Sequence, residues 1–122
     1  MGKQKVEKVE DLIVYQRAMR LFDDFIGADM DILDRHYAGR ELAKQLVRSL
    51  DSICGNMEEG FGRKAGKEFK HFLRIARGSA RESKGRYVRC SRFLAGDIIK
   101  RRVAQLDEIL AMLFSLIGKL SD

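Results

Sequence analysis

Apolar residues recur at steps of three and four along most of this 122-residue chain, which is the spacing of one face of an α-helix. The repeats predict four helices, at about 9–26, 39–60, 65–93 and 98–120. Gly27 is the expected end of the first helix and Gly60 with Gly62 that of the second, because glycine suits the left-handed residue that closes a helix. Asp97 is the expected N-cap of the last helix.

The fold class that follows is all-α. The chain has no proline and few turn clusters, which favours long helices over strands. Short connections make successive helices antiparallel neighbours, so we expect an antiparallel up-down-up-down four-helix bundle. This single domain would cover 1–122, with 1–8 flexible, and 27–39 would be a solvated acidic connector. The acidic residues of the connector are Asp29, Asp31 and Asp34.

The last predicted helix is apolar around its whole circumference between 109 and 117. A bundle helix needs one apolar stripe, so a helix that is apolar on all sides is expected to be buried on more than one side. The run is too short to span a bilayer, and we expect no membrane association. We expect a homo-oligomer whose interface includes Met112, Leu113 and Leu116, the alternative being an unusually apolar monomer surface.

The net charge of +6 is concentrated in one segment of the chain. Residues 1–62 hold nine Lys and Arg against twelve Asp and Glu, and residues 103–122 hold one against three. Residues 63–102 hold fourteen against three. Such a concentration predicts a surface of one sign.

Six cations of the third predicted helix recur at steps of 3, 4, 3, 4 and 3, which places them on one face over about 25 Å. This basic stripe consists of Lys67, Lys70, Arg74, Arg77, Arg81 and Lys84. Cations that flank it are Arg63, Lys64, Arg86, Arg89, Arg92, Lys100, Arg101 and Arg102. The stripe could be a solvated face or could meet acidic residues of a neighbouring subunit. We favour contact with phosphates, whose charge and spacing reward this arrangement through counterion release.

No set of catalytic, metal-binding or cofactor-binding residues accompanies this surface in the sequence. Glu58 and Glu59 have no histidine or nucleophile at a useful spacing. Cys54 and Cys90 lack metal or redox spacing and are expected to be buried, reduced thiols. We therefore expect no enzymatic activity, no metal and no cofactor. A cytoplasmic location is also expected, because residues 1–10 are polar and charged rather than a signal peptide.

Eight polar and glycine positions in the middle of the chain carry a family resemblance. They are Arg48, Asn56, Glu59, Gly60, Arg77, Gly78, Ser79 and Glu82. In these positions the chain resembles the small proteins encoded within intervening sequences of 23S ribosomal RNA genes, a family related to accessory proteins of diversity-generating retroelements. Cys54 and Glu58 depart from the pattern, since proline and a small residue are usual there.

The resemblance implies a four-helix bundle that assembles into a ring-shaped homopentamer, with nucleic acid as its partner and RNA favoured over DNA. Five of the matching residues would form an interior network that fixes helix register or joins one subunit to the next. These structural residues are Arg48, Asn56, Glu59, Arg77 and Glu82. We expect a non-enzymatic, nucleic-acid-binding bundle. The alternative is a protein-interaction scaffold, such as an accessory subunit that engages a reverse transcriptase or another nucleic-acid enzyme.

Overall fold

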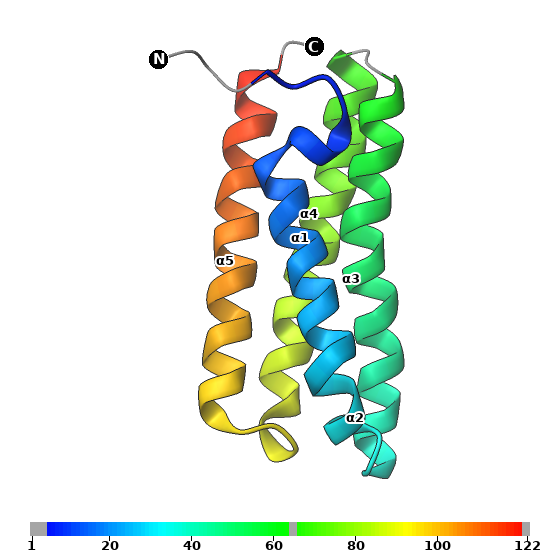
Figure 1. Cartoon of the computed structure of the whole chain (residues 1–122), viewed down its shortest axis with the longest axis vertical. Helices are drawn as coiled ribbons and strands as arrows, with labels where there is room; N and C mark the ends of the chain where they lie inside the picture. Colours follow the sequence, from blue (N-terminus) through cyan, green and yellow to red (C-terminus); the bar gives the residue numbers. More distant parts are fainter. Residues whose placement is uncertain (1–4, 64–65, 121–122) are drawn as a thin grey trace.

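The protein is a set of four long helices packed side by side, as a computed structural model that describes residues 5–63 and 66–120 shows (Figure 1). No strand occurs within those two ranges, so the predicted all-α class is confirmed. The long helices are α1 (Ile13–Asp24), α3 (Tyr37–Arg63), α4 (Gly66–Arg89) and α5 (Gly96–Lys119). In Figure 1 the chain runs down α1, up α3, down α4 and up α5. Helix α1 packs against α3 and α5, and it lies diagonally across the bundle from α4.

Short helical segments join and precede these helices. A 3-10 turn at Val9–Asp11 (η1) precedes α1, and another at Cys90–Arg92 (η3) follows α4. Between α1 and α3 lie a π-helical segment at Phe25–Asp29 (η2) and one turn of α-helix at Met30–Leu33 (α2). The first predicted helix, expected to begin near Val9, begins at Ile13 instead, because Leu12 has an extended backbone, and the helical segment continues further than predicted.

The prediction that Gly27 ends the first helix is wrong. The residues on either side of η2, Asp24 and Met30, both have right-handed helical backbone angles, and the helix continues through Gly27 to Leu33. The extra residue in the π-helical turn changes which side chains face inward. Asp29, predicted to be solvated, is only 1% exposed as a result, whereas Asp31 is exposed as expected.

The prediction that Gly60 and Gly62 end the second helix is also wrong, because α3 continues through both to Arg63. Gly60 is buried against the first turns of α4. A Cβ atom at this position would lie 2.8 Å from Cβ of Phe72 and 3.0 Å from Cδ1 of Phe69. The glycine is required for a close approach between two helices and does not close one of them.

The start of the last helix differs slightly from expectation. Helix α5 begins at Gly96, and its N-cap position is Ala95, which makes no side-chain capping hydrogen bond. Asp97 lies in the first turn instead of at the cap. A carboxylate there still interacts favourably with the positive end of the helix dipole.

The core is built from the apolar faces that the sequence pattern predicts. Leu46, Leu50, Ile53 and Met57 of α3 are all buried in it. Where α3 crosses α4 the buried side chains are small, and hydroxyl groups pair across the contact. Ser52 Oγ lies 2.8 Å from Ser79 Oγ, and Ser83 Oγ donates to Ser49 Oγ at 2.8 Å. These pairs fix the register of the two helices.

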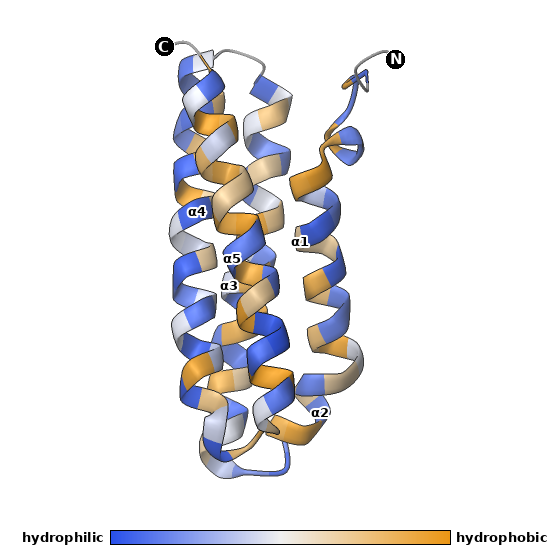
Figure 2. Ribbon diagram, turned by 90° about the vertical axis from the view of Figure 1, so that its left-hand side faces the viewer, coloured by the Kyte–Doolittle hydropathy of each residue, from blue (hydrophilic) through white to orange (hydrophobic). Residues whose placement is uncertain are grey.

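Most of the apolar run of α5 packs against other helices of the same chain. Helix α5 packs against both α1 and α4 (Figure 2). Leu113 is fully buried in the core. Leu113 therefore cannot be the subunit contact that we predicted, because no partner can reach it. Met112 and Leu116 are half-buried, and Phe114 is 70% exposed.

Candidate nucleic-acid interface

The basic stripe runs along the side of α4 that faces away from the core. Leu73, Ala76 and Ala80 occupy the opposite, buried side of the helix. Three of the six stripe cations are exposed and three are half-buried. The exposed ones are Lys67, Arg74 and Arg81, and the half-buried ones are Lys70, Arg77 and Lys84. One continuous cationic face about 25 Å long results.

Most of the stripe is not neutralised by the chain. Lys84 Nζ lies 2.7 Å from Asp107 Oδ1 on α5, so this amine already has an anionic partner. Within residues 5–63 and 66–120, four stripe residues make neither a hydrogen bond nor an ion pair through their side chains. They are Lys67, Arg74, Arg77 and Arg81.

Several flanking cations are held by carboxylates on their own helices. Arg63 pairs with Glu59 at 2.7 Å, Arg86 with Glu82 at 3.3 Å, and Arg101 with Asp97 at 3.7 Å. Pairs of this kind at the surface contribute little free energy, about 0–1 kcal/mol, and exchange readily for a phosphate. Three other flanking cations are exposed and have no such partner in the described part of the chain: Arg89, Arg92 and Lys100. The predicted contact Lys64 lies outside the described residues.

Arg102 does not belong to this surface, and the prediction that it contacts nucleic acid is wrong. Its side chain is buried, with the residue only 5% exposed. Arg102 Nε donates to Asp29 Oδ2 at 2.7 Å and Nη2 donates to Asp29 Oδ1 at 3.2 Å. Tyr87 Oη donates to the same carboxylate at 2.6 Å. The three side chains join η2, α4 and α5 at the lower end of the bundle in Figure 1.

This buried cluster perturbs the acidity of its members. The hydrogen bonds that Arg102 donates to Asp29 raise the pKa of Arg102 above its usual value, so the guanidinium stays charged. Burial raises the pKa of Tyr87, and the hydrogen bond to Asp29 raises it further. A signal for the burial of Arg102 was present in the sequence, since Leu106 and Ile109 follow it at steps of four and seven. We assigned Arg102 to the surface because it follows two other cations, Lys100 and Arg101.

The interior network predicted among the family-signature residues does not form between the helices of a single chain, within the residues described. Glu59 and Glu82 each bind an arginine on their own helix. Asn56 donates to the backbone oxygen of Ser52 at 2.8 Å and to its hydroxyl at 2.9 Å. Arg77 belongs to the basic stripe instead.

Several signature residues nevertheless meet at one place, a groove of about 390 Å³ between α3 and α4. The groove is lined by the signature residues Arg48, Ser79 and Glu82. Asn56 does not line it, but it donates a hydrogen bond to Ser52, which lines the groove and pairs with Ser79. Arg48 is exposed and has no ionic partner among the residues described. Arg86, on the opposite wall, has a buried Nε atom that makes no hydrogen bond within the described chain. This polar groove is a second candidate surface for a partner.

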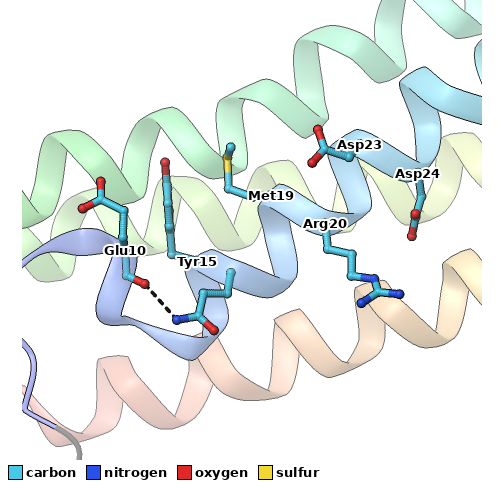
Figure 3. Close-up of a pocket in the computed structure, with 7 residues that line it drawn as sticks. Glu10, Tyr15, Met19, Arg20, Asp23 and Asp24 are labelled. Atoms are coloured by element: carbon cyan, nitrogen blue, oxygen red, sulfur yellow. Dashed lines mark hydrogen bonds between the residues drawn. The ribbon is translucent and has the colours of Figure 1, made fainter.

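The far side of the bundle carries a small acidic pocket. This shallow pocket of about 620 Å³ runs along the outer face of α1, and Figure 3 shows Arg20, Asp23 and Asp24 towards one end of it. Glu10 adds a third carboxylate at the other end. Tyr15, at the edge of the pocket, donates to Glu58 Oε2 at 2.7 Å. Because this pocket holds three carboxylates and one arginine, it does not compete with α4 for a polyanion.

No cluster of side chains within residues 5–63 and 66–120 could hold a metal ion. None of the helices described is both long enough and apolar enough to cross a membrane.

A four-helix protein with one basic face is the class that this geometry defines. The chain belongs to the family of 23S rRNA-intervening sequence proteins, whose sequence profile matches residues 10–115. The match confirms the family resemblance and extends through most of α5. No curated protein matches the chain.

Proposed function

We propose that this protein is a non-enzymatic, cytoplasmic nucleic-acid-binding protein, in which an antiparallel up-down-up-down bundle presents the basic stripe to the phosphates of RNA. The observation that carries the proposal is the set of four stripe cations that have no anionic partner in the described part of the chain. Each phosphate that meets such a cation releases condensed counterions, which favours binding. Arginine supplies most of these contacts, and its planar fork suits phosphate oxygens.

RNA is favoured over DNA because the family is named for 23S rRNA intervening sequences. The chain has no motif for reading base edges in a groove, so recognition would rest on backbone charge and on RNA shape. Binding of this kind is salt-dependent and tolerant of sequence.

The proposal includes assembly into a homo-oligomer, for which the resemblance favours a pentameric ring. Half-buried Met112 and Leu116 line an open apolar groove together with Val6 and Ile13, which are both partly exposed. This groove replaces Leu113 as the proposed subunit contact. A ring would repeat the basic stripe in each subunit, and linked sites raise the effective concentration of phosphates at each one.

A charge reversal on the stripe tests the proposal. In the double variant Arg74→Glu/Arg81→Glu two unpaired cations become anions, and affinity for a fluorescent RNA at low salt should fall by about tenfold or more. The matched control is Arg20→Glu/Arg35→Glu, which changes the net charge equally but alters neither the stripe and its flanking cations nor the apolar groove. Equal losses in both variants, or no loss in either, would contradict a role for the stripe.

The alternative function is a protein-interaction scaffold, such as an accessory subunit of a reverse transcriptase or another nucleic-acid enzyme. The groove between α3 and α4 favours it, because Arg48 and the Nε atom of Arg86 are donors without acceptors in the described chain. Absence of RNA and DNA binding by the wild-type protein at low salt would support this alternative. Loss of a co-purified protein in Arg48→Glu would then locate the contact.

A further inference from the structure

One exposed aromatic side chain lies beside the basic stripe, and its position follows from the register of α4 against α5. The ion pair between Lys84 and Asp107, at 2.7 Å, fixes that register. Side chains seven residues apart lie two helical turns apart on nearly the same face. Arg77 precedes Lys84 by seven residues and Phe114 follows Asp107 by seven. Because the two helices run in opposite directions in Figure 1, Arg77 and Phe114 lie at the same level, about 10 Å above the ion pair.

The ring of Phe114 is open to solvent. The residue is 70% exposed, and it makes no ring stacking or cation–π contact with any residue in the described ranges. Its exposed neighbours one turn away on α5 are Ala111 and Gly118, which carry little or no side chain. A planar group can therefore lie flat on the ring without displacing other side chains.

The cations nearest to this ring are the unpaired ones. Arg77 is at its level, and Arg74 and Arg81 lie about one turn to either side along α4. An aromatic ring next to a row of unpaired arginines is the arrangement that single-stranded nucleic acids need, since bases stack on rings while phosphates follow the charges. A duplex cannot use the ring, because its bases are stacked inside and the RNA major groove is deep and narrow.

We propose that Phe114 is a base-stacking platform and that the stripe prefers single-stranded RNA to duplex RNA. The inference rests on the proposed function of α4 and adds the class of RNA that it binds. A subunit contact is the other use for an exposed ring, but the apolar groove of α5 lies on its α1 side, at Met112 and Leu116. Phe114 lies on the α4 side, among charged and small residues.

The test compares a single-stranded RNA of about a dozen unstructured nucleotides with the matched duplex, both measured by fluorescence anisotropy at low salt. Phe114→Ala should weaken single-strand binding by about tenfold and leave duplex binding within about twofold. The matched control is Met19→Ala, which truncates a partly exposed apolar side chain in the acidic pocket on α1 and should change neither.

A second variant gives a direct readout of stacking. The chain contains no tryptophan, so Phe114→Trp introduces a single tryptophan at the proposed platform, which can be excited selectively over the three tyrosines. Its emission should be quenched by the single strand and not by the duplex, and single-strand affinity should match or exceed that of the wild type.

The outcomes separate this inference from the proposed function. If Phe114→Ala changes neither affinity or lowers both equally while Arg74→Glu/Arg81→Glu weakens both, the stripe stands and the stacking platform is overturned. A smaller oligomer for Phe114→Ala in light scattering would also overturn it, in favour of a subunit contact. If the wild-type protein binds neither RNA, the proposed function fails and the inference fails with it.

Discussion

At the scale of single residues, the Asp29 carboxylate is the centre of a buried polar cluster. It accepts two hydrogen bonds from Arg102 and one from Tyr87, and all three side chains are buried. A buried arginine is tolerated because carboxylates offset its charge, here Asp29 at 2.7 Å and Asp24 at 3.7 Å. The cluster therefore explains why Arg102, a cation of the basic segment, is buried while its neighbours Lys100 and Arg101 are exposed.

Replacement of Asp29 by asparagine should destabilise the protein strongly. Asp29→Asn keeps the shape of the side chain but leaves the buried Arg102 guanidinium only its longer ion pair with Asp24, at 3.7 Å. The cost should therefore be about 3 kcal/mol, the lower end of the range for breaking a buried ion pair. Urea unfolding followed by circular dichroism measures the difference. The control is Asp34→Asn, an exposed carboxylate with no partner in the described chain, which should stay within about 0.5 kcal/mol of the wild type. A small effect of Asp29→Asn would show that the pair is not needed.

At the scale of helices, the apolar period predicted the four long elements and their buried faces. The faces of α3 and α4 are buried as the spacing of Leu46, Leu50 and Leu73 requires. The glycines misled the prediction, because a sequence does not distinguish a glycine that closes a helix from one that lets another helix approach. The π-helical turn at Phe25–Asp29 has no such periodic signal, so neither it nor the burial of Asp29 could be read from the spacing.

The candidate site, like the fold, could be predicted from the sequence only in part. The stripe was predictable because six cations at helical spacing must share a face, whatever the tertiary structure. Which of them are neutralised was not predictable, because the partner of Lys84 is Asp107 on another helix. The groove between α3 and α4 also needs the tertiary contact, since Arg48 and Glu82 come from different helices.

Two glycine substitutions on α3 should have opposite effects on stability. Gly60→Ala places a methyl group against Phe69 and Phe72 and should destabilise the protein by about 1–3 kcal/mol. Gly55→Ala, five residues earlier on the same helix, meets open space and should stabilise it by up to about 1 kcal/mol. Thermal unfolding of both variants makes the comparison. If Gly60→Ala were also stabilising, the close helix approach described here would be wrong.

At the scale of the whole molecule, the charge is uneven across the bundle, with cations along α4 and an acidic pocket on α1. The apolar groove lies between them, where the N-terminal part of the chain meets α5. In a ring built by rotation, each subunit offers two different surfaces to its neighbours. The proposed assembly uses the apolar groove and leaves the basic stripe free for RNA.

The assembly is tested by a charge placed in the apolar groove. Ile13 is partly exposed at the first position of α1, where glutamate is favoured by the helix dipole. Ile13→Glu should therefore leave the fold intact and reduce the oligomer to smaller species in multi-angle light scattering. The control Ile75→Glu alters an equally exposed isoleucine in the groove between α3 and α4 and should not change the mass. The reverse result would move the subunit contact to that groove.

The central claim is that unpaired cations of α4 bind phosphates, and the salt dependence of RNA binding tests it most directly. With four such cations and a slope of about −0.7 per contact on a single strand, the logarithm of the affinity should fall with the logarithm of salt concentration at about −3. The double variant Arg74→Glu/Arg81→Glu keeps at most two of the four phosphate contacts, so its slope should be near about −1 by the same reasoning. A wild-type slope near zero, or the same slope in both proteins, would contradict the account.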